Sequence, residues 1–262
     1  MAKRRSLQLD GLRLQGCDLA SIARGEVRLV LTPGARREVR RSRGVVELIA
    51  SRGVSVYGIK TGFGRFCDVP VPAGDMRALQ VNLVRSHGAG VGEPLGDDVV
   101  RLALALRANA LARGRSGIRL ETLELLISLY NEDVLPWIPS QGSVGASGDL
   151  APLAHLAQVL IGEGRARVGG RWMSGRAALR KCGLSPGRLE AKEGLSLITG
   201  VQVSRACLAT ALLLADTLLE AADVIGAITL DALLCSLVPF HRKIHDARPH
   251  PGQRVVARHL RH

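Results

Sequence analysis

Aromatic residues are scarce in this sequence: Phe, Trp and Tyr together make up 3% of its 262 residues. A buried core must therefore come from Leu, Val, Ile and Ala, which dominate the 47% of residues that are apolar. Helices pack well through Leu and Ala, whereas β-sandwiches depend on aromatic and β-branched residues. The composition favours a mainly helical globular protein and excludes a chain that is disordered throughout.

Cysteine is also rare, and its five copies are far apart in the sequence. No C-x-x-C pair occurs, which excludes zinc ribbons and thioredoxin-type motifs. Unpaired, widely spaced thiols are typical of a reducing compartment, so we expect a cytoplasmic protein. His241 and His245 have no Cys or carboxylate at ligand spacing, and we interpret them as solvated histidines rather than metal ligands.

Long uninterrupted apolar runs are absent as well. The first residues contain Asp10, Arg13 and Asp18, which break any signal-peptide pattern. A membrane span needs about 18 or more apolar residues in succession. The most apolar stretch, residues 200–240, does not meet that condition, and we expect soluble helices there. Its interrupting charges are Arg205, Asp216, Glu220, Asp223 and Asp231.

Acidic residues are fewer than basic ones, 23 against 36, and the formal net charge is +13. Most of this excess lies at the ends: residues 1–45 carry +7 and residues 241–262 carry +5. A nucleic-acid binder usually concentrates basic residues on one folded face, often with aromatic residues for stacking. The observed distribution favours solvated arginine over nucleic-acid binding.

Apolar residues recur at helical spacing through much of the chain. Residues 8–30 predict a short strand or turn and a small helix, and residues 165–173 a small hairpin. Val39, Val45, Val46 and Ile49 are predicted as the buried side of their helix. No βαβ alternation is visible, which disfavours a doubly wound fold. The predicted helices span about residues 35–51, 75–86, 97–116, 118–132, 149–161, 174–182, a segment from Ser185-Pro186, and 201–235.

Several glycine-rich segments fail the tests for common catalytic loops. In Gly58-Ile59-Lys60-Thr61, Ile59 separates glycine from lysine, whereas a P-loop needs the two adjacent. Residues 88–92 do not have the G-x-G-x-x-G spacing, and no serine has glycines at both −2 and +2. These segments therefore do not predict a nucleotide site or a nucleophile elbow.

Residues 141–149 form another glycine- and serine-rich segment, which contains Ala146-Ser147-Gly148. One interpretation is a flexible loop before a helix capped by Asp149, whose free N–H groups hold an anion. The other is cyclisation, in which the Gly148 nitrogen attacks the Ala146 carbonyl carbon and Ser147 loses its hydroxyl. Glycine suits that attack because it has no side chain and an unrestricted φ. The product would be a strong electrophile made only from protein.

Residues 142–153 (G-S-V-G-A-S-G-D-L-A-P-L) closely resemble the signature of the aromatic amino acid ammonia-lyase and aminomutase family. Further segments are similar to that family and occur in the same order. They are residues 57–64 (Y-G-I-K-T-G-F-G), 80–87 (Q-V-N-L-V-R-S-H), 193–197 (E-G-L-S-L) and 244–253 (I-H-D-A-R-P-H-P-G-Q). The resemblance therefore covers essentially the whole chain.

The resemblance implies a carbon–nitrogen lyase with a mainly α fold. It implies a 4-methylidene-imidazol-5-one group formed autocatalytically from Ala146, Ser147 and Gly148, with no external cofactor and no metal. Tyr57 matches the family's mobile-loop tyrosine, the proposed base for the substrate's β-proton. It further implies an N-terminal domain at residues 1–115 with this loop, and the start of a central helix bundle at residues 116–262.

The resemblance also has implications for the substrate. In the family, the residue pair that corresponds to Ser86-His87 helps to determine which aromatic ring is bound. This pair is similar to the histidine-specific branch, which converts histidine to urocanate, and His87 can hydrogen-bond an imidazole. Tyrosine or phenylalanine ammonia-lyase and aminomutase activities remain alternatives. The family forms homotetramers with shared active sites, so we expect a homo-oligomer with no membrane or nucleic-acid partner.

The sequence departs from the family pattern in two respects. Thr199 stands where the histidine branch usually carries Asn, a residue credited with binding the prosthetic group or the substrate. Family chains also continue well beyond 262 residues, and the later part supplies further active-site side chains. We therefore expect little lyase activity from this chain by itself, and a non-catalytic helical scaffold is a further alternative.

Overall fold

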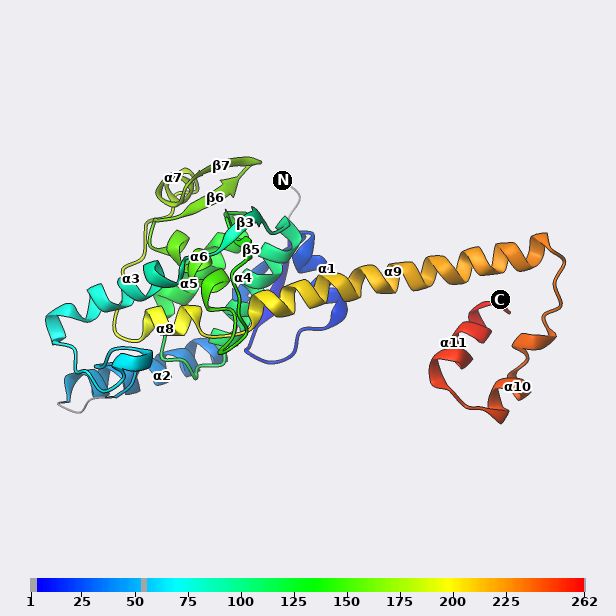
Figure 1. Ribbon diagram of the computed structural model, residues 1–262, viewed down its shortest axis with the longest axis horizontal. Coiled ribbons are helices and arrows are strands. Elements are labelled where there is room, and N and C mark those ends of the chain that lie inside the picture. The colour runs from blue at the N-terminus through cyan, green and yellow to red at the C-terminus, as the bar shows by residue number, and fades with distance from the viewer. Residues whose placement is uncertain (1–3, 53–55, 262) are drawn as a thin grey trace. The chain divides into compact units, whose positions relative to one another are not determined.

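The computed structural model describes residues 4–52 and 56–261. By its internal contacts the chain divides into two compact units, residues 1–210 and 211–262, and each is described by itself. Helices dominate both units, as the sequence predicts (Figure 1). Within the described residues, no helix combines the length and the apolar character needed to cross a membrane.

Helix positions in the first unit agree closely with the sequence periodicity. The α-helices are α1 (Gly16–Ala23), α2 (Pro33–Ser51), α3 (Met76–His87), α4 (Asp97–Ala112), α5 (Leu120–Asn131), α6 (Leu150–Leu160), α7 (Gly175–Lys181) and α8 (Glu193–Ile198). The short 3-10 helices η1 (Gly64–Phe66) and η2 (Ala73–Asp75) lie between α2 and α3. Thr32 caps α2 by accepting a hydrogen bond from the Ala35 N–H at 3.1 Å, and Pro33 fits the first turn.

Two predictions about these helices are wrong. No helix begins at Ser185-Pro186; the chain there is irregular up to α8, and the Gly187 N–H donates to the Leu160 carbonyl at 2.8 Å. Val45 is 54% exposed, although Val39 and Val46 of the same helix are buried. At 100° per residue, Val45 points away from the face that Val39 and Val46 share.

The strands are short and form small sheets. They are β1 (Arg5–Leu9), β2 (Val27–Leu31), β3 (Val91–Pro94), β4 (Leu135–Pro136), β5 (Pro139–Gln141), β6 (Arg165–Val168) and β7 (Arg171–Ser174). β6 and β7 form the predicted hairpin, and β4 pairs with β6 in the same sheet. β3 pairs antiparallel with β5.

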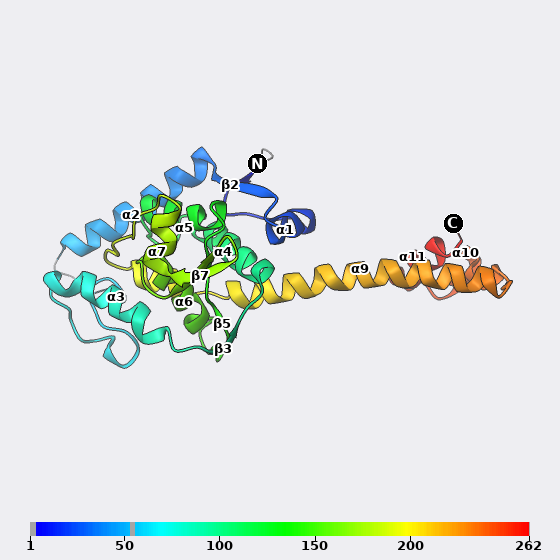
Figure 2. The same cartoon turned by 90° about the horizontal axis from the view of Figure 1, so that it is seen from above.

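The N-terminal strands correct the expectation that no β–α–β arrangement is present. β1 and β2 are parallel and in register from Arg5↔Val27 to Leu9↔Leu31, with α1 between them in sequence. Figure 2 shows β2 and α1 near the N-terminus. The residues V-R-L-V-L of β2 alternate strictly between buried and exposed positions, which is the pattern of a half-buried strand. The sheet has two strands, so the fold is not doubly wound.

The core of the first unit is built from aliphatic residues of the central helices. α4 contacts α1, α2 and α5, and α6 contacts α3 and α8. Leu104, Leu123 and Leu156, from α4, α5 and α6, are fully buried. These helices are buried around much of their circumference, which is typical of helices inside a bundle. They form the framework that positions the loops between them.

The second unit consists of most of α9 and the segments after it. α9 is one helix (Gln202–Ala232), followed by η3 (Val238–Phe240), α10 (Arg242–Ala247) and α11 (Pro251–His259). His245 is buried in this unit, with Nε2 3.1 Å from the Pro239 carbonyl, so the prediction that it is solvated is wrong. His241 caps α10 by accepting from the Lys243 N–H.

Candidate active site

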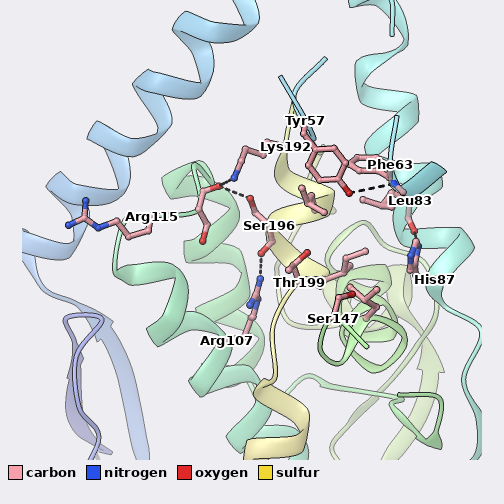
Figure 3. Close-up of a pocket in the computed structure, with 15 residues that line it drawn as sticks. Tyr57, Phe63, Leu83, His87, Arg107, Arg115, Ser147, Lys192, Ser196 and Thr199 are labelled. Carbon is pink, nitrogen blue, oxygen red and sulfur yellow. Dashed lines mark hydrogen bonds between the residues drawn. The ribbon is translucent and has the colours of Figure 1, made fainter. Parts of the chain in front are cut away.

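A cavity of about 470 Å³ lies in the first unit, where the loop before α3, the loop before α6, α3, α4 and α8 meet. Tyr57, His87, Ser147 and Thr199 all line it, although they are far apart in the sequence (Figure 3). Ala146 and Gly148 flank Ser147 in the same loop. The structure therefore brings the residues predicted from sequence to one place.

Tyr57 enters the cavity from a glycine-rich loop. Its side chain is 50% exposed and packs edge-on against Phe63, with ring centroids 6.0 Å apart. The Gly64 N–H points to the Tyr57 hydroxyl oxygen at 3.5 Å. Gly58 has φ +74° and lies so close to Leu195 that a Cβ would overlap with that side chain. The glycine thus allows the loop to approach α8 and present the phenol to the cavity.

His87 lies at the last position of α3, and its hydrogen bonds define its tautomer. Its Nδ1 is 2.9 Å from the Leu83 carbonyl oxygen and 3.1 Å from Ser86 Oγ. A carbonyl oxygen only accepts hydrogen bonds, so Nδ1 carries the proton. In the neutral ring Nε2 is therefore an acceptor. It is suited to a ligand ring that donates a hydrogen bond.

The loop that carries Ala146, Ser147 and Gly148 is held by a buried carboxylate. Asp149 is 1% exposed, and its carboxylate accepts from Ser143 Oγ at 3.0 Å and from the N–H and Oγ of Ser204 at 2.8 and 2.5 Å. Asp149 stands at the N-cap position of α6, as predicted, but its side chain does not cap the helix. Its oxygens instead bind Ser143 of the same loop and Ser204, and the bonds to Ser204 tie the loop to the start of α9.

Of the glycines in this loop, Gly148 has the least room for a side chain. Its φ is +99°, and a Cβ there would overlap with the Gly200 carbonyl oxygen. The same Gly200 oxygen accepts a hydrogen bond from the Asp149 N–H at 2.6 Å. Ala146 and Ser147 remain exposed. This arrangement fits a cyclised Ala-Ser-Gly group, because only glycine fits at position 148 and Ser147 faces the cavity.

The cavity also contains charged residues that the sequence analysis missed. Arg107, Arg115 and Lys192 line it, and no Asp or Glu is among the described lining residues. Burial lowers the pKa of Arg107 to about 10 and also lowers the pKa of Lys192. A uniformly basic lining favours a ligand that carries a carboxylate. The missed signal for Arg107 was a charge within the apolar run of α4.

The lining includes further polar contacts, but no metal-binding cluster. Lys192 Nζ donates to the Ser116 carbonyl at 2.8 Å, and Ser196 Oγ donates to the same oxygen at 2.7 Å. Within the described residues, no group of three or more His, Cys, Asp or Glu side chains is placed to hold a metal ion. Thr199 is exposed at the cavity, one residue before Gly200.

Comparison with known protein families places this site in a recognised class. Residues 14–262 match the family described as aromatic amino acid lyase. The chain belongs to this family, whose members depend on a methylidene-imidazolone group. The match includes every residue that lines the cavity.

Individual relatives refine the comparison. The chain is 49% identical to histidine ammonia-lyase of Myxococcus xanthus over 253 residues, which is 97% of this chain and 50% of that protein. It is 51% identical to histidine ammonia-lyase of Gloeobacter violaceus, with 97% and 49% covered. The crystal structure of histidine ammonia-lyase from Trypanosoma cruzi superposes with a TM-score of 0.91 at 38% identity, covering 98% of this chain and 49% of that one. The chain spans about half the length of the curated relatives it matches.

Proposed function

We propose that this chain acts in a histidine ammonia-lyase, which removes ammonia from L-histidine without oxidation and leaves urocanate. The observation that carries the proposal is the position of His87 in one cavity with Tyr57 and Ser147. With Nδ1 engaged by the Leu83 carbonyl, its Nε2 is able to accept a hydrogen bond, and both imidazole N–H and phenol O–H groups can donate one. A phenyl ring has no such donor, so this residue favours histidine or tyrosine over phenylalanine.

The names of the relatives favour histidine over tyrosine. Histidine ammonia-lyases from Myxococcus xanthus and Gloeobacter violaceus are about half identical to this chain. The structural neighbours also include tyrosine aminomutase of Streptomyces globisporus, at 35% identity. The sequence pair Ser86-His87 and the higher identities support histidine as the substrate.

Ala146, Ser147 and Gly148 would form the 4-methylidene-imidazol-5-one group in this proposal. When present, that group supplies an electrophile that accepts electron density from the substrate and so helps ammonia to leave. The support from this chain is the fit of Gly148 against Gly200 and the tether through Asp149. Both constrain the loop while Ser147 remains open to the cavity.

Tyr57 would remove the β-proton of the substrate. Its hydroxyl oxygen is at the cavity, and the Gly64 N–H points to that oxygen at 3.5 Å. Arg107, Arg115 and Lys192 would favour binding of the substrate carboxylate, since the described lining carries no opposing charge. Thr199 would contribute a hydroxyl in place of the amide that is usual in the histidine branch.

The proposal extends to assembly and location. The relatives are about twice as long as this chain, and the family assembles as tetramers, so we propose that activity requires a homo-oligomer and the remaining half of the protein. All five cysteines are free, which supports a reducing, cytoplasmic environment.

The proposal is tested by mixing the chain with the separately produced C-terminal half of the Myxococcus xanthus histidine ammonia-lyase. Urocanate and the corresponding products of tyrosine and phenylalanine are followed by absorbance. We expect turnover of histidine to exceed turnover of tyrosine and of phenylalanine. His87→Phe should weaken binding of the transition state by about 1–3 kcal/mol and so lower kcat/KM for histidine. Equal rates on all three substrates would contradict the assignment. Absence of turnover with intact folding would favour the non-catalytic scaffold.

A further inference from the structure

Arg107 is a buried charge without an opposite charge. It lies on α4 and is 4% exposed. Its guanidinium donates to Gln202 Oε1 at 2.8 Å and to the Ser196 carbonyl, while its Nε finds no partner. Among the described residues, no carboxylate lies within ion-pair distance of it. Burial of an unpaired charge destabilises a protein, so stability does not explain this arginine.

Arg107 and its partner Gln202 both contact the backbone of Gly200. A Cβ at Gly200 would overlap with both the Arg107 guanidinium and Gln202 Oε1, so the two side chains pack directly against the Gly200 backbone. The planar guanidinium binds Gln202 and the Ser196 carbonyl at the same time. Arg107 therefore fixes the end of α8 and the start of α9, with the peptide of Gly200 between them.

Gly200 in turn contacts the loop that carries Ala146, Ser147 and Gly148. Its carbonyl oxygen accepts from the Asp149 N–H at 2.6 Å and lies where a Cβ of Gly148 would be. These contacts orient the peptide that follows Gly148. Since Gly148 holds φ +99° in this position, the direction of its nitrogen toward Ala146 depends on where Gly200 is held.

We propose that Arg107 is a positioning residue for ring closure at Ala146-Ser147-Gly148. The proposal rests on the prosthetic group of the proposed function. In the closure, a bond forms between the Gly148 nitrogen and the Ala146 carbonyl carbon. The Ala146 oxygen leaves as water with the hydrogens of the Gly148 and Ser147 nitrogens. Ser147 then loses its Cα hydrogen and its hydroxyl as a second water, so no oxidant is required.

Arg107 touches none of these atoms and acts through Gln202 and Gly200. Small displacements of reacting groups reduce rates strongly, by about 100-fold for a shift of about 1 Å. Lysine at position 107 would keep the charge but would lack the fork that binds two acceptors. Leucine at position 202 would remove the acceptor, whereas glutamate would retain it.

The experiment follows ring closure by mass spectrometry of the peptide that contains residues 146–148, sampled over time after synthesis of the full chain. We expect Arg107→Lys and Gln202→Leu to slow the loss of two waters by about tenfold or more. Gln202→Glu should close at the parent rate. The matched control is Arg101→Lys on the same helix, where Arg101 binds Asp133 and the Ala23 carbonyl away from the cavity.

Hydrogen exchange provides a second measurement, made in a Ser147→Ala background. We expect Arg107→Lys to accelerate exchange of the Asp149 amide, while the amides that pair β1 with β2 keep their protection. A parent that closes its ring, with variants that close as fast, overturns the role of Arg107 alone. A folded parent that never closes overturns the prosthetic group and this role together. If Arg107→Lys does not fold, the Gln202→Leu and Gln202→Glu pair decides.

Discussion

The two units contain the same kinds of apolar residue and differ in how these residues are buried. In the first unit, Leu104 and Leu123 are fully buried between helices. In the second unit, Leu218 and Leu219 on α9 are 70% and 65% exposed, and Leu234 just after α9 is 92% exposed. Every lining residue of the candidate active site comes from the first unit. The first unit therefore contains the candidate active site, and the second contains exposed apolar surface.

The largest effect that we expect concerns this exposed apolar surface. An apolar area of about 400 Å² left in water forfeits roughly 10 kcal/mol, which is comparable to the net stability of a domain. The purified chain should therefore self-associate or remain partly unfolded in residues 211–261. Size-exclusion chromatography with light scattering measures this.

Substitutions on α9 test the cause of that association. Leu212→Glu combined with Leu218→Glu should shift the chain toward monomer, since both leucines are exposed. The matched control replaces Arg205 and Glu220 by Gln on the same helix and should leave the association unchanged. A parent chain that is a stable, fully folded monomer would contradict the claim that the exposed apolar residues of the second unit need a partner.

Two Leu→Ala substitutions, one in each unit, compare how much buried and exposed leucines contribute to the free energy of unfolding. Leu123→Ala removes a fully buried side chain and should lower the free energy of unfolding by about 2–5 kcal/mol. In the monomeric chain, Leu218→Ala removes a residue that is 70% exposed and should change this free energy by about 0.5 kcal/mol or less. Denaturant unfolding followed by far-ultraviolet circular dichroism, at a concentration where the chain is monomeric, measures both. Similar losses would show that α9 is buried in solution.

The smallest effect involves pH and a histidine in the first unit. Burial lowers the pKa of His155, whose Nε2 accepts a hydrogen bond from the Gly90 N–H at 3.0 Å. Above the ordinary histidine pKa of about 6.5 both states are neutral and this group adds no pH dependence. Below it the unfolded chain takes up the proton first, so the free energy of unfolding falls as pH drops through the lowered pKa.

His155→Gln isolates that contribution, because the glutamine amide oxygen still accepts from the Gly90 N–H but does not titrate. The difference in unfolding free energy between the parent and His155→Gln should change only below pH of about 6.5. A constant difference from pH 5 to 8 would contradict a lowered pKa for the half-buried His155 imidazole.

Local patterns in the sequence predicted most of the first unit. Helical periodicity located α2 to α6, and Gly169-Gly170 located the turn between β6 and β7. The same reasoning failed where a distant contact decides the structure. Residues 185–190 have a helix-start signal in Ser185-Pro186, but Gly187 is bound to Leu160, and the segment stays irregular.

The site residues also fall into those that local sequence patterns predicted and those that depend on distant contacts. Tyr57, His87 and Ser147 belong to motifs that can be read from adjacent residues. Arg107 and Lys192 are held at the site by contacts with residues far away in the sequence: Arg107 binds Gln202 and Ser196, and Lys192 binds Ser116. The only local hint was the charge of Arg107 within the apolar run of α4. Asp149 looked like a helix cap, yet its carboxylate binds Ser204, which is 55 residues away.

The central claim is that the first unit holds Ala146, Ser147 and Gly148 in a geometry that forms the electrophile. The mass of the proteolytic peptide that contains these residues tests it most directly, with Ser147→Ala as the control that cannot form the methylidene. We predict that the parent peptide is lighter than its sequence by two waters. An unmodified mass from chain whose first unit is folded would contradict the account.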